Sequence, residues 1–289
     1  MKFGVFSLLT DTSASVEAVA RKCEDLGYEA FLLPEHPITP VSHHSRYVGS
    51  SDGVVPEPLS FIIDPFVGLG IASAVTSKIK LGTGICLVPE RDPIVTAKEV
   101  ATVDFVSSGR FLFGIGAGWL REELEIMGVD FKQRWEVTID YIRAMKELWT
   151  TPESSYEGAF VKFPPVKSFP KPVQKPHPPI IVGAGGGNGR GNDRAIAVTV
   201  AIGDEWGPSI MTPEQLKPEL EELHKACEQA GRDYRKIGIT IFAPLPGDDA
   251  HAAIREYEKA GVHRVILFPP TLAPDKYAVE LEDLARTWM

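Results

Sequence analysis

Glu35 and His36 are the residues best suited to acid–base chemistry, and they lie in the segment LLPEHPITP, between two prolines. A histidine gains or loses its proton near neutral pH and can therefore act as a general acid or base toward a bound ligand. We predict Glu35 and His36 as the catalytic residues. The alternative interpretation is that His36 is a loop residue that supports the turn at Pro37.

Two further histidines, His43 and His44, follow closely and raise the question of a metal site. The chain has no HExxH motif, and no second group of carboxylates and histidines stands at ligand spacing. We therefore expect no bound metal.

A glycine-rich segment, IIVGAGGGNGRGND, carries six glycines within nine residues. The dinucleotide fingerprint G-x-G-x-x-G is absent, because Asn188 or Arg190 stands where its third glycine is required. Backbone N–H groups at the entrance to a helix bind anions, and Arg190 adds a planar cation suited to phosphate. We predict a phosphate site over 183–190, and a mobile glycine-rich loop is the alternative.

Glycines also interrupt the segments LGTGICLVPERDP and GRFLFGIGAGWLREE. Glycine inside a strand pattern marks a bulge or the close approach of a ligand, and tight packing is the alternative. The second segment also lacks the dinucleotide spacing, because Trp119 or Arg121 occupies the third glycine position. Gly116 and Gly118 nevertheless offer a surface without side chains, on which a flat ligand can lie beside Trp119.

The elements that must position these residues alternate between strand and helix along the whole chain. The predicted strands are FGVFSLL, AFLLP, IKLGTGICLV, RFLFGIG, IIVG, 204–206, IGITIFA and VHRVILF. Helical spacing of apolar residues follows each strand, including one long helical region that ends near Trp149. Eight such units predict a parallel sheet and a (β/α)8 TIM barrel of the α/β class, with a doubly wound sheet as the alternative.

The segment from Thr151 to Pro179 departs from this alternation, since it holds eight prolines and four lysines. Such a segment cannot form a regular helix, and we predict an ordered insertion after the fourth unit that can act as a lid or as an edge of the substrate pocket. The chain shows no other block of different character. We therefore expect residues 1–289 to form a single domain.

Composition narrows the class of partner. The formal net charge is −9 and no Lys/Arg-rich run occurs, so nucleic acid and anionic membranes are not expected partners. No apolar run approaches the roughly 18 residues of a membrane span, and the N-terminal apolar segment is too short for a signal peptide. Three widely separated cysteines fit a reducing compartment, so we expect a cytoplasmic protein.

The segment LGTGICLVPERDPIVTAKEVATVDFVSSGRFLFGIGAGWLREELE resembles the signature block of the luciferase-like monooxygenase superfamily, in particular its F420-dependent oxidoreductases. The aspartate of ATVDFVSSGR and the run PVQKPHPPIIVG before the fifth strand also recur in that family. The resemblance extends over essentially the whole chain. It implies a (β/α)8 barrel with insertions, expected to form a homodimer, and a flavin or deazaflavin ring at the mouth of the barrel.

The resemblance also assigns residues to the cofactor. It implies a non-proline cis peptide at Gly84–Ile85, contacts of Glu35 and His36 with the ring, and a phosphate-bearing tail on the glycine run. The expected cofactor-binding residues are Glu35, His36, Gly84, Ile85, Cys86, Leu87, Gly116, Gly118, Trp119, Gly183, Ala184, Gly185, Gly186, Gly187, Asn188 and Arg190.

One position departs from part of the family. F420-dependent sugar-phosphate dehydrogenases have a glutamate acid where this chain has Trp119, so we do not expect that branch. The sequence favours an F420-dependent oxidoreductase that transfers a hydride between the deazaflavin and a small organic substrate, with Trp119 as a wall of the substrate pocket. The alternatives are an FMN-dependent two-component monooxygenase and a non-enzymatic flavin-binding protein.

Overall fold

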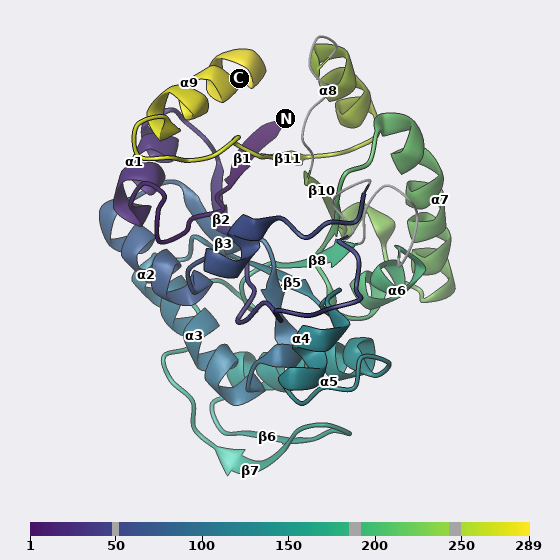
Figure 1. The fold of residues 1–289 in the computed structure, drawn as a ribbon. Coiled ribbons are helices and arrows are strands. Elements are labelled where there is room, and N and C mark those ends of the chain that lie inside the picture. Colours follow the sequence, from purple (N-terminus) through teal and green to yellow (C-terminus); the bar gives the residue numbers. More distant parts are fainter. Residues whose placement is uncertain (48–51, 185–191, 243–249) are drawn as a thin grey trace.

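The core of the protein is a closed barrel of parallel strands surrounded by helices (Figure 1). The structure is a computed structural model and describes residues 1–47, 52–184, 192–242 and 250–289. The barrel strands are β1 (Lys2–Phe6), β2 (Ala30–Leu33), β3 (Lys80–Thr83), β5 (Phe111–Gly116), β8 (Ile180–Ala184), β9 (Glu205–Pro208), β10 (Gly238–Phe242) and β11 (Arg264–Leu267). A short strand, β4 (Cys86–Leu87), continues the line of β3 and also pairs with β5.

Closure of the barrel rests on two pairings. The strands follow one another in the order β3-β2-β1-β11-β10-β9-β8-β5, and β3 pairs with β5. The first and last strands are parallel neighbours, with Val5 opposite Leu267. A doubly wound sheet leaves these strands apart, so the predicted TIM barrel is confirmed.

The helices around the barrel are α1 (Val16–Asp25), α2 (Pro65–Val75), α3 (Pro93–Val106), α4 (Arg121–Ile126), α5 (Arg134–Thr150), α6 (Asn192–Ile202), α7 (Pro213–Gln229), α8 (Ala250–Lys259) and α9 (Tyr277–Trp288), with short 3-10 turns η1 (Glu57–Phe61), η2 (Val88–Glu90) and η3 (Tyr234–Lys236). Asp64 and Asp92 cap α2 and α3, and each is followed by a proline at the first helical position. The single long helical region expected up to Trp149 is wrong. It is divided into α4 and α5, because Gly128 adopts φ 85° just after α4.

Two apolar layers fill the fold. Residues inside the barrel form one buried cluster, made of Ala30, Leu32, Leu112, Ile181, Phe242 and Ile266. A larger cluster lies between the outer face of the strands and the helices. Alternate residues of each strand therefore face opposite layers, as the two-residue period of a strand requires. In the part of the chain that the structure describes, no helix is both long enough and apolar enough to cross a membrane.

The proline-rich segment 151–179 contains an antiparallel hairpin, β6 (Ser154–Glu157) and β7 (Lys162–Val166), which lies beyond α5 in Figure 1. Asp140 of α5 holds the hairpin, because its carboxylate accepts hydrogen bonds from the Tyr156 hydroxyl at 2.7 Å and the Phe160 N–H at 2.7 Å. No hairpin residue lines the cavity described below. The position of the hairpin therefore gives no support to its predicted role as a lid or as an edge of the pocket.

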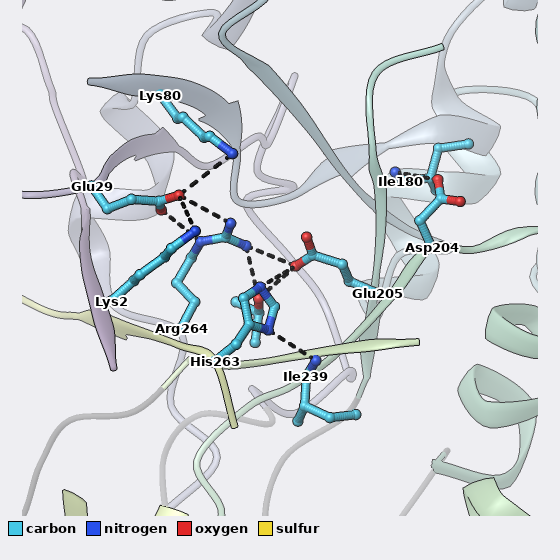
Figure 2. Close-up of polar contacts among 10 residues, drawn as sticks. Lys2, Glu29, Lys80, Ile180, Asp204, Glu205, Ile239, His263 and Arg264 are labelled. Atoms are coloured by element: carbon cyan, nitrogen blue, oxygen red, sulfur yellow. Dashed lines mark hydrogen bonds and ion pairs between the residues drawn. The ribbon is translucent and has the colours of Figure 1, made fainter. Parts of the chain in front are cut away.

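A polar cluster closes the N-terminal end of the barrel (Figure 2). Arg264 is 2% exposed and lies between two carboxylates, donating to Glu29 Oε2 at 2.7 Å and to Glu205 Oε2 at 2.7 Å. Burial alone would raise the pKa of Glu205, but His263, Arg264 and Thr240 outweigh it and lower the pKa to about 2. The charges at this end are therefore paired with one another.

Candidate active site

A cavity of about 410 Å³ lies at the C-terminal ends of the barrel strands. Each barrel strand contributes to it through its last residues or the loop that follows. Its lining residues are Phe6, Pro34, Glu35, His36, Tyr47, Leu59, Gly84, Ile85, Leu87, Gly116, Ala117, Gly118, Trp119, Phe131, Arg134, Trp135, Gly183, Ala184, Gly207, Ser209, Ile210, Phe242 and Phe268. This is the end of a TIM barrel at which active sites are found.

The peptide bond between Gly84 and Ile85 is cis, as expected from the family resemblance. The Ile85 side chain extends over the glycines of two neighbouring strands. A Cβ atom on Gly116 would overlap Ile85 Cδ1, and one on Gly183 would lie 2.8 Å from the same atom. The missing side chains of Gly116 and Gly183 therefore make room for Ile85 as well as for a ligand.

The Glu35 carboxylate is bound within the protein, although Glu35 itself lines the cavity. It accepts hydrogen bonds from the Leu87 N–H at 2.7 Å and from Arg91 Nε at 2.5 Å. Arg91 also binds Asp64 at 2.6 Å and Glu99 at 2.9 Å. These contacts join the loop after β2 to β4 and to the segment that follows it. They favour a positioning role for Glu35, and its catalytic role stays a prediction.

His36 forms the centre of a hydrogen-bonded chain at the cavity wall. Its Nδ1 lies 2.7 Å from Oε2 of Glu123, a residue of α4 with a fully buried side chain. On the other side, Trp119 Nε1 donates to His36 Nε2 at 3.4 Å. An indole N–H can only donate, so Nε2 presents its lone pair and the ring proton lies on Nδ1, toward Glu123. This arrangement suits a general base that acts through Nε2.

Aromatic and cationic side chains form the outer part of the cavity. Trp119 packs edge-on against Tyr47, with ring centroids 5.3 Å apart. Arg134 lies over the Phe131 ring at 3.8 Å and donates to the carbonyl oxygen of Gly118 at 3.1 Å. Burial, followed by the positive charge of Arg121, lowers the pKa of Arg134, and both guanidinium groups lie over the Phe131 ring.

The glycine run is described only at its edges. Gly183 and Ala184 line the cavity, while Gly185, Gly186, Gly187, Asn188 and Arg190 lie outside the described residues. The helix α6 begins at Asn192, whose side chain is fully buried. Neither its amide oxygen nor its amide nitrogen has a hydrogen-bond partner among the described residues.

The predicted residues therefore converge on one cavity, with one exception among those described. Cys86 does not line the cavity, and burial raises the pKa of its thiol well above the usual range. Sequence reasoning did not assign Tyr47, Glu123, Phe131, Arg134 or Trp135. The last three belong to the segment FKQRW just before and at the start of α5, where closely spaced aromatic and cationic residues were the available signal.

The buried carboxyl groups of Glu35, Glu90 and Glu123 lie near the cavity wall that His36 forms, but they are not arranged as a metal centre. Among the residues with described positions, no three histidine, cysteine, aspartate or glutamate side chains are placed to hold a metal ion.

Comparison with known sequences gives matches along the chain. A model of the luciferase-like monooxygenase family matches residues 1–286. The uncharacterised protein Rv0953c of Mycobacterium tuberculosis is 34% identical over 290 residues, which cover 99% of this chain and 98% of that protein. The pyrimidine monooxygenase RutA of Escherichia coli is 28% identical over 208 residues, which cover 69% of this chain and 52% of that protein.

Solved structures share the fold at lower identity. The monooxygenase RslO1 from Streptomyces bottropensis has a TM-score of 0.71 and 19% identity, covering 100% of this chain and 98% of that chain. The F420-dependent tetrahydromethanopterin reductase from Methanopyrus kandleri has a TM-score of 0.68 and 20% identity, covering 97% and 96%. At these identities the likeness establishes the barrel fold alone.

Proposed function

The chain belongs to the luciferase-like monooxygenase family and is an oxidoreductase of that family; on this premise, we propose that it transfers a hydride between the deazaflavin F420 and a small organic substrate. The observation that carries the proposal is the pair of hydrogen bonds that link Trp119, His36 and Glu123 at the cavity wall. It supplies an oriented proton acceptor where a substrate would meet a bound ring.

The described residues fit a flat ring with an anionic tail. The cavity of about 410 Å³ falls within the range of roughly 300–1,000 Å³ that small-molecule sites occupy. Its floor includes the aromatic side chains of Phe6, Phe242 and Phe268, which suit the face of a ring. The amide of Asn192, which has no partner among the described residues, lies at the start of α6, where a helix favours negative charge.

His36 would hold and move the proton that accompanies the hydride. A bound deazaflavin supplies the carbon that gives or accepts the hydride, whereas the protein orients the reactants and supplies the acid–base group. In the direction of alcohol oxidation, the substrate hydroxyl replaces the Trp119 N–H at His36 Nε2 and gives its proton there. Glu123 keeps its hydrogen bond to Nδ1 and stabilises the imidazolium that results. The reverse direction returns the same proton to a carbonyl oxygen.

Glu35 and Trp119 have different parts in this proposal. The carboxylate of Glu35 fixes the segment that carries Ile85 and Leu87, so its effect on turnover is indirect. Trp119 separates His36 from the space next to Tyr47 and forms one wall of the substrate pocket.

The alternative is an FMN-dependent monooxygenase of the same family. The relatives in solved structures include both kinds, since one is described as F420-dependent and another as a monooxygenase in complex with FMN. The cationic group at the cavity favours F420 in a chain of net charge −9, because the tail of that cofactor is long and acidic. Arg134 lines the cavity, where the positive charge of Arg121, the negative charge of Glu136 and the positive charge of Arg194 act on it.

Titration of the purified protein with each cofactor tests this choice. We expect F420 to bind more tightly than FMN, and raising the salt concentration to weaken F420 binding more than FMN binding. Tight binding of FMN without affinity for F420 would contradict the proposal.

Substitution of His36 tests the acid–base role. His36→Gln should lower turnover roughly 10²–10⁴-fold, measured as F420 oxidation or reduction against a panel of alcohols and carbonyl compounds. F420 affinity should change little, because the glutamine keeps the shape of the wall. His44→Gln is the matched control, since His44 lies in the same loop and is exposed.

Assembly as a homodimer also stays a prediction. The neighbouring helices α2 and α3 expose the apolar side chains of Val67, Ile71, Ile94, Val95, Phe105 and Val106. Apolar surface of this kind is typical of an interface. Light scattering after gel filtration measures the mass in solution.

A further inference from the structure

Glu90 is a buried acid for which the site described above has no use. It ends the 3-10 turn η2, directly after β4, and is 6% exposed. Both of its carboxylate oxygens are buried, and neither has a hydrogen-bond partner among the described residues. An ionised carboxylate in this position would lose its hydration without gaining any compensating contact.

The groups facing Glu90 make ionisation still less favourable. Glu123 faces it from α4 and Glu35 from the end of β2, and both act on it as negative charges. The nearest cation in the sequence is Arg91, and its guanidinium donates hydrogen bonds to Glu35, Asp64 and Glu99. Burial, followed by the charges of Glu123 and Glu35, raises the pKa of Glu90 to about 9.

Glu90 lies immediately behind the cavity wall. A Cβ atom added to Gly118 would lie 3.2 Å from Glu90 Oε1, and Gly118 itself lines the cavity. Gly118 adopts φ 80°, a conformation that favours glycine, and its missing side chain lets Glu90 approach the backbone of a residue that lines the cavity. The hydrogen bond from His36 to Glu123 belongs to the same wall.

We propose that Glu90 is a positioning residue whose proton keeps the negative charge of this wall on Glu123, where it holds the Nδ1 proton of His36. Two adjacent buried carboxyl groups cannot both be ionised without strong repulsion, so one of them retains a proton. The two are not equivalent, because Glu123 has His36 and the Ile38 N–H as partners, whereas Glu90 has none in the described part of the chain. The proton therefore stays on Glu90.

The state of Glu90 then controls the state of His36. When Glu90 gives its proton to solvent at alkaline pH, a second negative charge appears beside Glu123. This charge acts on the Glu123 carboxylate and, through its hydrogen bond to Nδ1, on the lone pair that His36 presents at Nε2. The inference rests on the proposed acid–base role of His36 for its effect on turnover, whereas the protonation of Glu90 is independent of that role and of any cofactor.

Infrared spectroscopy of the protein without cofactor tests the proton directly. The C=O stretching band of a protonated carboxylic acid should be present at neutral pH in the wild type and absent from Glu90→Gln. In the wild type this band should disappear with a midpoint near pH 9, the value expected for Glu90. Glu157→Gln is the matched control, because the Glu157 side chain is exposed on the hairpin and should contribute no such band.

Nuclear magnetic resonance of labelled histidine tests the coupling. The His36 ring signals, assigned by their absence from His36→Gln, should shift as Glu90 titrates near pH 9 in the wild type. They should remain constant over the same range in Glu90→Gln. If Glu90→Gln does not fold, Glu90→Leu serves the same comparisons, since it replaces the acid by an apolar side chain of similar size that needs no hydrogen-bond partner.

Two results would overturn the inference. Spectra of wild type and Glu90→Gln that differ at neutral pH only by a carboxylate band would show that Glu90 is ionised. A protonated Glu90 whose titration leaves the His36 signals unchanged would show that it does not act on His36. Failure of the protein to bind F420 would contradict the proposed function and leave both measurements in place.

Discussion

Both ends of the barrel bury ionisable side chains, but among the described residues these side chains are ion-paired at one end and lack an ion pair or face a cavity at the other. At the N-terminal end, Arg264 is bound by Glu29 and Glu205, and Figure 2 shows the guanidinium between the two carboxylates. At the C-terminal end, Glu90 has no partner among the described residues, and His36 has a partner on either side while facing a cavity.

This difference separates stability from chemistry. Mutually paired charges hold strands together and leave no group free to bind a ligand. Unpaired or cavity-facing groups cost stability, but they are available to a cofactor, a substrate or a proton. Among the described residues, buried side-chain atoms without a hydrogen-bond partner occur at Ser7, Glu90, Glu122 (its Oε2 alone) and Asn192, which lie at the C-terminal ends of strands or beyond them, and at Trp206 within β9.

The largest expected effect is a loss of stability on substitution of Arg264, at the N-terminal end of the barrel. Arg264→Met leaves the buried Glu205 and the half-buried Glu29 without their shared cation, and breaking a buried pair in this way costs about 3–5 kcal/mol. Equilibrium unfolding in urea measures the loss. A decrease below about 1 kcal/mol would show that the N-terminal cluster does not stabilise the barrel.

Raising the pH should lower the free energy of unfolding through Glu90, at the C-terminal end of the barrel. Glu90 has a pKa raised from 4.5 to about 9, so between these values the folded protein binds a proton that the unfolded chain has released. Stability therefore falls as pH rises through this window, by at most about 1.4 kcal/mol per pH unit. Glu90→Leu should remove this slope, which thermal melts from neutral pH to pH 9 can measure. Parallel curves for the two proteins would contradict the expectation.

Lowering the pH should lower the free energy of unfolding through Glu205, at the N-terminal end of the barrel. The pKa of Glu205 is lowered from 4.5 to about 2, so its contribution is complete above 4.5 and is lost as pH falls toward 2. The slope is again at most about 1.4 kcal/mol per pH unit. Glu205→Gln should therefore flatten the acid side of the stability profile. The comparison between the two ends fails if this variant loses stability in acid as steeply as the wild type does.

The smallest effect is expected at the rim of the N-terminal cluster. Lys2 lies 3.8 Å from Glu29 and its side chain is 55% exposed. Exposed ion pairs contribute roughly 0.2–1 kcal/mol, so Lys2→Ala should change the unfolding free energy by no more than this. A loss comparable with that of Arg264→Met would mean that the cluster depends on its exposed charges.

Local sequence patterns were sufficient to predict the barrel. Apolar runs bounded by glycine and proline marked the strands, and prolines after Asp64 and Asp92 marked two helix starts. These signals lie within a few residues of the element that they specify. The division between α4 and α5 was missed, because Gly128 follows a helical pattern that continues on both sides of it.

The partners of the site residues depend on contacts between distant segments. His36 was found because it follows a strand, but Glu123 lies 87 positions away in the sequence. Arg264 and Glu29 are 235 positions apart. Their pairing is set by the order of strands around the barrel, and a single sequence carries no direct signal of it. The sequence also carried no sign that the Glu90 carboxylate lacks a hydrogen-bond partner among the described residues, because the elements that bury it are distant in the sequence.

The fit of Ile85 over Gly116 and Gly183 restricts how the cavity can change in evolution or by design. A side chain at position 116 would occupy the space of Ile85 Cδ1, so the two positions cannot be altered independently. A shorter residue at position 85 must come first, and only then can position 116 accept a larger one. The order of substitutions, and not only their identity, therefore decides which variants of this cavity can be reached through folded intermediates.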